Sequence, residues 1–174
     1  GVWKTSEGSI YSMKQVADGS EALIKAGWDL KDSQEQVAHV MNLAKIEGID
    51  LASATTIVTD GLNAFGMHAN ETERFVDALN IASVKSTTGI SEMGETFKYV
   101  GAIAGTLGFT VEDTALAVAL MAGNGVKASQ AGTSLRAGLT NLVQPSKQAS
   151  KVLNEIGFSI TDTSGKVKPL SLSL

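Results

Sequence analysis

A glycine recurs along the chain in a fixed local setting, and this pattern constrains the fold more than any other sequence feature. Each of these glycines precedes an apolar residue, with a polar residue that can cap a helix shortly after it. Glycine readily adopts the left-handed conformation with which many helices end, because it has no Cβ to clash. The polar side chain can then accept a hydrogen bond from the free amides of a new helix. The pattern predicts helix-to-helix connections at Gly27, Gly48, Gly66, Gly89, Gly108, Gly125 and Gly157.

Between these glycines the apolar residues repeat with the period of an α-helix. Val37, Val40, Met41 and Ala44 follow the spacing i, i+3, i+4, i+7, which places them on one helix face. Similar stripes recur through the rest of the chain. We predict eight helices, near residues 10–26, 33–47, 51–65, 71–87, 91–106, 111–123, 128–143 and 146–156.

Several residues predict where helices begin. The stretches 32–35 ("DSQE") and 110–113 ("TVED") have the spacing of a capping box, in which the first and fourth residues exchange hydrogen bonds. Pro145 in "QPSK" is expected at a first helical position, where its missing N–H costs nothing.

The run "ALAVALMA", residues 115–122, is apolar on every side of a helix. Such a helix is typically buried all round. We therefore expect 111–122 to form the central helix of the core, with Leu116 and Leu120 inside it.

The chain as a whole is predicted to be all-α. Uneven glycine spacing and the lack of residues that recur at fixed offsets favour an irregular array of short antiparallel helices over a superhelical stack. After Gly157 the pattern alternates at Phe158 and Ile160 and turns near 162–165, which predicts a short β-hairpin. We expect a helical module at 1–157, followed at 158–174 by the hairpin and an end that looks cut off.

Composition argues against several classes of function. The chain has no cysteine, so it can form neither a disulfide nor a thiolate metal site. A formal net charge of −4 and only two arginines, Arg74 and Arg136, argue against direct nucleic-acid binding, which needs clustered cations. The longest apolar run, 115–123, is far shorter than the roughly 20 residues of a membrane span.

A search for reactive groups yields no site residue. His39 is expected at the edge of a core face and His68 in a loop, and neither has metal-ligand spacing. The acid pairs Glu92/Glu95 and Glu112/Asp113 fall in first helical turns, where the helix dipole favours negative charge. We therefore predict no catalytic residue, no metal site and no cofactor.

Two glycine-rich stretches have structural explanations. The glycines of 121–129 ("MAGNGVKAS") lack the GK[ST] of a phosphate loop and do not follow a predicted strand. Residues 131–142 carry small side chains and Arg136 on one predicted helix. This helix could contact an anionic partner, but close packing within the chain is the favoured interpretation.

Three stretches, 26–66, 94–136 and 153–170, resemble the core region of tail tape measure proteins of long-tailed bacteriophages. The resemblance runs from about Val16 to Leu170, and "GETFKYVGAIAGTLGFTVEDTALAVALMAGNGVKASQAGTSLR" is its most specific part. It brings no catalytic motif. In that family a long helical protein inside the tail tube sets tail length during assembly and later helps DNA reach the host cytoplasm.

The resemblance implies a virion role, first in the host cytoplasm during assembly and then in the tail tube, in a free phage or a prophage. It also implies contacts with further copies of the chain and with tail-tube, tail-tip and tail assembly chaperone proteins. A measuring rod should be one continuous helix, whereas this chain is interrupted by glycines, so we expect a compact module within the ruler. The alternatives are a cytosolic helical adaptor that binds a partner helix in an apolar groove and, less favoured, a lysozyme-like hydrolase.

Overall fold

A computed structural model describes residues 11–86 and 88–157 of the 174-residue chain. These residues form eight α-helices and one short 3-10 helix, without a strand among them. The elements are α2 (Met13–Lys25), α3 (Leu30–Glu47), α4 (Leu51–Phe65), η1 (Ala69–Glu71), α5 (Thr72–Ser86), α6 (Ile90–Thr106), α7 (Val111–Gly123), α8 (Ala128–Val143) and α9 (Lys147–Glu155).

The all-α class and all eight predicted helices are confirmed, with boundaries that differ by no more than three residues. The β-hairpin predicted after Gly157 lies outside the described residues.

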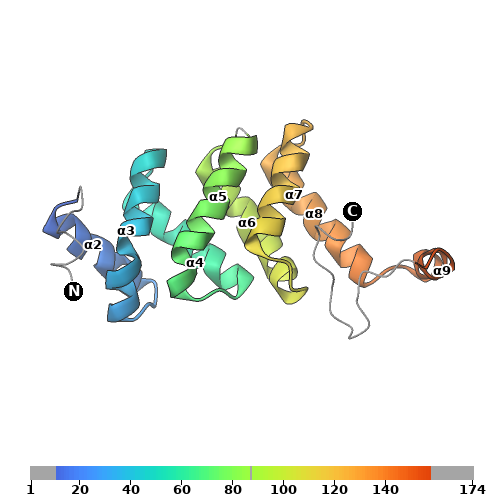
Figure 1. The fold of residues 1–174 in the computed structure, drawn as a ribbon, viewed down its shortest axis with the longest axis horizontal. Coiled ribbons are helices and arrows are strands. Elements are labelled where there is room, and N and C mark those ends of the chain that lie inside the picture. The colour runs from blue at the N-terminus through green and yellow to red at the C-terminus, as the bar shows by residue number, and fades with distance from the viewer. Residues whose placement is uncertain (1–10, 87, 158–174) are drawn as a thin grey trace.

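The helices form a two-layer stack that follows the order of the chain (Figure 1). Helices α2, α4, α6 and α8 pack one after another in the first layer, and α3, α5 and α7 do so in the second. Each helix also packs against its sequence neighbour in the opposite layer, from α2 through α8. The arrangement is therefore more regular than the irregular array we expected. Alternate helices can stack without a sequence repeat, because each needs only an apolar face toward the layer opposite.

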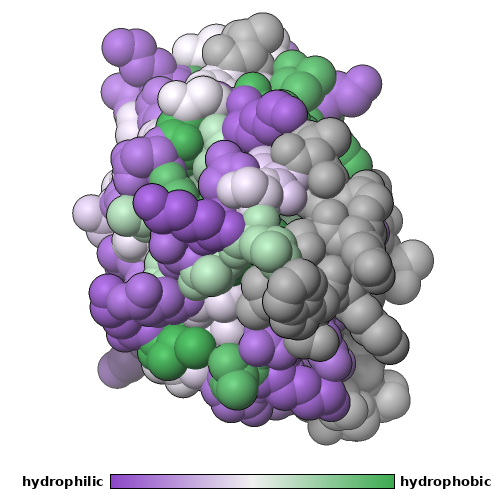
Figure 2. Space-filling view, turned by 90° about the vertical axis from the view of Figure 1, so that its left-hand side faces the viewer, coloured by the Kyte–Doolittle hydropathy of each residue, from purple (hydrophilic) through white to green (hydrophobic). Residues whose placement is uncertain are grey.

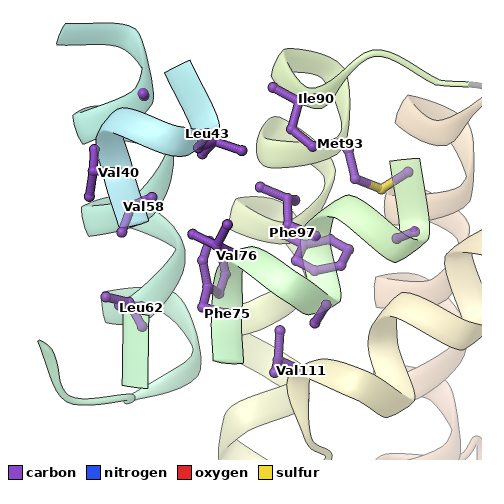
Figure 3. Close-up of a cluster of buried hydrophobic side chains, with 14 of the residues drawn as sticks. Val40, Leu43, Val58, Leu62, Phe75, Val76, Ile90, Met93, Phe97 and Val111 are labelled. Carbon is purple, nitrogen blue, oxygen red and sulfur yellow. The ribbon is translucent and has the colours of Figure 1, made fainter. Parts of the chain in front are cut away.

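The core lies between the layers and is mainly aliphatic. Side chains from α3 to α7 converge there, as Figure 3 shows for Leu43, Val58, Phe75, Met93 and Phe97. The Phe97 ring meets the rings of Phe65 and Phe75 edge-on, with centroids 5.9 and 6.2 Å apart. This geometry suits aromatic pairs, because a ring edge carries positive and a ring face negative partial charge.

Glycines allow the helices to approach closely inside the first layer. A Cβ on Gly105 of α6 would lie 2.9 Å from the backbone oxygen of Phe65 at the end of α4. A Cβ on Gly94 would meet Ile57 of α4 at 2.8 Å, and one on Gly132 of α8 would meet Thr96 of α6 at the same distance. Helix α6 thus packs so closely against α4 and α8 that a larger side chain would not fit at these three glycines.

Six of the seven predicted helix-ending glycines have positive φ and lie at or next to a helix end. Gly89 also lies in a connection between two helices, but its φ is −63° and it is the N-cap of α6, so the expected left-handed helix end is wrong there. It begins a helix instead of ending one, because α5 stops at Ser86.

The predicted helix starts were partly right. The capping box of Thr110 and Asp113 is present, with both reciprocal hydrogen bonds. The box predicted at Asp32 is wrong: α3 begins earlier, and Asp32 donates its backbone N–H to the N-cap Asp29 at 2.7 Å. Pro145 precedes the N-cap, Ser146, and so lies outside α9.

The expectation of a fully buried α7 is also wrong. Leu116 is 52% exposed and Leu120 53% exposed. The buried face of α7 holds Val111, Ala115 and Val118. Helix α7 lies in the second layer. Its inner face packs against other helices, whereas its apolar outer face remains on the surface.

This correction leads to a matched prediction for two leucines. Leu79→Ala on α5 empties a fully buried site and should lower the free energy of unfolding by about 2–5 kcal/mol. Leu120→Ala on α7 should change it by no more than about 0.5 kcal/mol, as is usual at the surface. Urea unfolding of both variants checks this, and equal losses would contradict the assigned faces.

A second prediction concerns two helical glycines. Gly105→Ala should destabilise the chain by about 1–3 kcal/mol, because the new methyl group meets rigid backbone of Phe65. Gly138→Ala, with open space around its Cβ, should stabilise α8 by about 0.5–1 kcal/mol through helix propensity alone. Thermal unfolding that shifts in the same direction for both would refute the close approach of α6 and α4.

Candidate functional site

An apolar groove runs along the outer face of the second layer, between α5 and α7. Its volume is about 470 Å³. We call it the α5/α7 groove. The residues that define it are Ala78, Ile81 and Lys85 of α5 and Leu116, Ala119 and Leu120 of α7.

The groove follows from the sizes of the side chains on two neighbouring helices. Ala78 and Ala115 are only 5% exposed and leave a shallow channel where α5 and α7 meet. Ile81, Leu116 and Leu120 are each more than half exposed beside it. Exposed apolar surface gathered in one concave place is typical of a protein contact, whereas scattered single residues are not.

A charge cluster closes one end of the groove. Arg74 of α5 donates two hydrogen bonds to the Glu112 carboxylate, at 2.6 and 2.8 Å, and a third to Glu71 at 2.9 Å. The hydrogen bonds from Arg74 hold the pKa of Glu112 below its usual value, so this carboxylate is ionised at neutral pH. Lys85 and Asn124 line the opposite end. The groove is therefore apolar in the middle, with one net negative charge on the cluster of Glu71, Glu112 and Arg74 at one end and the positive Lys85 at the other.

Three of the four acids considered for catalysis make hydrogen bonds within the chain. Glu92 and Glu95 are exposed on α6, and Glu92 accepts a hydrogen bond from the Ser129 amide at the start of α8, at 3.4 Å. Glu112 binds Arg74, while the Asp113 carboxylate accepts hydrogen bonds from the backbone N–H and the hydroxyl of the N-cap Thr110. Glu92 lines a polar pocket with Ser86, Thr88 and Lys127, and Glu112 lines the α5/α7 groove with Lys85.

The two histidines lie on different elements. His39 is partly buried on α3, and His68 is exposed just before η1. Among residues 11–86 and 88–157, no group of three acids or histidines is placed to hold a metal ion. No helix in the same part of the chain is both long and apolar enough to cross a bilayer.

The small residues of α8 serve packing within the chain. Ala131 is fully buried, and Gly132 lies against Thr96 of α6. Arg136 lies on the exposed side of α8. The structure thus supports the favoured interpretation of this helix.

Sequence reasoning missed the groove. Its signal was the run 115–122, which is apolar on all sides, but we took that pattern for burial. A second clue was Ile81, which falls off the apolar stripe formed by Phe75, Leu79 and Ala82. An exposed apolar groove forms where two neighbouring helices each carry an apolar residue outside the stripe that faces the core.

Comparison with known proteins places the chain among phage tail proteins. Residues 4–174 match the family described as phage-related minor tail protein. The tape measure protein of Pneumococcus phage Dp-1 is 34% identical over 93% of this chain, and the probable tape measure protein of Escherichia phage P2 is 25% identical over 88%. No solved structure matches the chain.

The match covers 14% of the Dp-1 protein and 19% of the P2 protein, so the chain spans less than a fifth of the length of these relatives. The family match over residues 4–174 includes the whole stretch that resembled tape measure proteins in the sequence. The chain belongs to the phage-related minor tail protein family and is related to tape measure proteins.

Proposed function

We propose that this chain is a non-enzymatic segment of a tape measure protein that acts in tail assembly and tail-length determination and, later, in DNA delivery. The family match supports the tail role. The observation that carries the mode of action is the α5/α7 groove, because it is a preformed concave surface with exposed apolar side chains.

The segment works through protein–protein contact. Its partners are further copies of the chain and the proteins of the tail tube, the tail tip and the tail assembly chaperone. A formal net charge of −4 disfavours electrostatic binding to DNA, so the effect of the segment on DNA passage is indirect. It acts inside the tail tube after assembly in the host cytoplasm.

The segment is a folded module within the ruler and does not itself act as the rod. A continuous helix advances about 1.5 Å per residue. Here the chain reverses direction after every short helix, so that successive helices in a layer add only about 8–10 Å, the usual spacing of packed helices. A stack is wider and shorter than a single helix of the same number of residues, and this shape suits docking better than length measurement.

The groove also fits the alternative function, an adaptor that binds a partner helix. Both functions use the groove to bind a partner protein, but one acts in the phage tail and the other in the cytosol. A tail role predicts a virion phenotype when the groove is altered, whereas a cytosolic adaptor predicts none.

A groove variant in the full-length phage protein tests the proposal. Leu116→Glu with Leu120→Glu keeps chain length and places charge in the apolar channel, so we expect few or no normal tails by electron microscopy. Ile46→Glu on α3 is the matched control, because Ile46 is 71% exposed and does not line the groove. Normal, infectious virions from the groove variant would reject the proposed contact.

Deletion of residues 91–143 tests whether the segment is a module. As a continuous helix this stretch would span about 80 Å at 1.5 Å per residue. We expect assembly to fail, because the deletion removes α6, α7 and α8 from the stack. Normal tails shortened by about that length would show that the segment measures length directly.

A further inference from the structure

Helix α9 is an amphipathic helix that has no extended contact with the other described helices. None of its residues is buried, and Figure 1 shows it beyond α8 at the end of the stack. Ala149, Val152 and Leu153 of α9 and its C-cap residue Ile156 have the spacing i, i+3, i+4, i+7. Val152 is 54% exposed and Ile156 67% exposed.

A helix of this length gains its stability from a partner. Isolated helices shorter than about 12–15 residues are marginal in water, because nucleation costs more than a few hydrogen bonds return. Helix α9 has nine residues, so an apolar surface that receives its stripe would stabilise it. The spacing of its apolar residues is the one with which helices occupy apolar grooves.

The α5/α7 groove has the length and charge to receive this helix. From Glu112 to Asn124 the groove runs about 18 Å along α7, and α9 spans about 12 Å, at 1.5 Å per residue. Docked parallel to α7, α9 would place Lys147 toward the end at which Glu71 and Glu112 face the single Arg74, a cluster with one net negative charge. Glu155 of α9, which is 3.9 Å from Lys151, would then lie toward Lys85. The net charges would be opposite at both ends, whereas the reverse orientation would bring Glu155 to the net negative cluster.

We infer that the α5/α7 groove binds α9 of a second copy of this chain. Val152 and Ile156 of one copy insert between Ile81, Leu116 and Leu120 of the other. Reciprocal exchange gives a dimer, and one-way exchange repeated from copy to copy gives a longer assembly. The inference rests on the self-association proposed above and assigns it to two named surfaces.

The test uses two variants of the 174-residue chain, each of which removes one side of the contact. Leu120→Glu alters the groove and leaves α9 intact, while Ile156→Glu alters α9 and leaves the groove intact. Both positions are more than half exposed, so circular dichroism should show unchanged folding. In analytical ultracentrifugation each variant alone should associate at least about tenfold more weakly than the parent chain, the loss expected for an interface anchor.

Mixing the two variants gives the decisive result. One still donates α9 and the other still accepts it, so the mixture should form a one-to-one heterodimer and nothing larger. Tyr99→Glu on α6, at a position that is 57% exposed outside the groove, should associate like the parent chain.

Three results would overturn the inference: a parent chain that stays monomeric at high micromolar concentration, variants that do not recover on mixing, or an Ile156→Glu chain that associates normally. Binding of α9 to anionic lipid vesicles without association between chains would assign its apolar face to membranes instead. These readouts concern oligomeric state in solution, so they can fail while the tail-assembly proposal holds, and the reverse.

Discussion

The close approach of α6 to its neighbours is the constraint on which the rest of the structure depends. Gly94 and Gly105 admit α4, and α8 meets α6 at Gly132. Only 5% of the residues are aromatic, so the core has few large side chains with which to fill wide gaps. Small residues shorten the distance between helices and restore the dense packing that dispersion forces require. The few large rings, Phe65, Phe75 and Phe97, then fill the space that remains between the layers.

This packing also determines which surfaces stay open. Helices α5 and α7 bury one face each toward the first layer and keep apolar residues on the other. Arg74 ties their first turns together, through paired hydrogen bonds to Glu112. By contrast, the end of the stack formed by α2 and α3 mixes hydrophobic and hydrophilic residues over the part of its surface that Figure 2 shows in colour. The α5/α7 groove, on the outer face of the second layer, is therefore an apolar surface with defined borders.

Local signals in the sequence predicted the helices well, whereas features set by packing between helices escaped them. Glycines with positive φ and a helical apolar period act within a few residues, so the boundaries followed directly. The stacking order and the exposure of Leu116 and Leu120 depend on which faces of distant helices meet. An all-round apolar helix looks the same in sequence whether it is buried or forms a binding surface. Gly89 illustrates the same limit, because a glycine can begin a helix as well as end one.

The described helices form a sequential stack organised around α6. In such a stack each helix depends on its nearest neighbours, so stability is graded along the chain instead of uniform. Hydrogen–deuterium exchange of the 174-residue chain measures this directly. We expect the slowest exchange in α6, intermediate exchange toward α2 and α8, and the fastest exchange in α9 at dilute protein concentration. Uniform protection across all the described helices, or faster exchange in α6 than in α2, would contradict it.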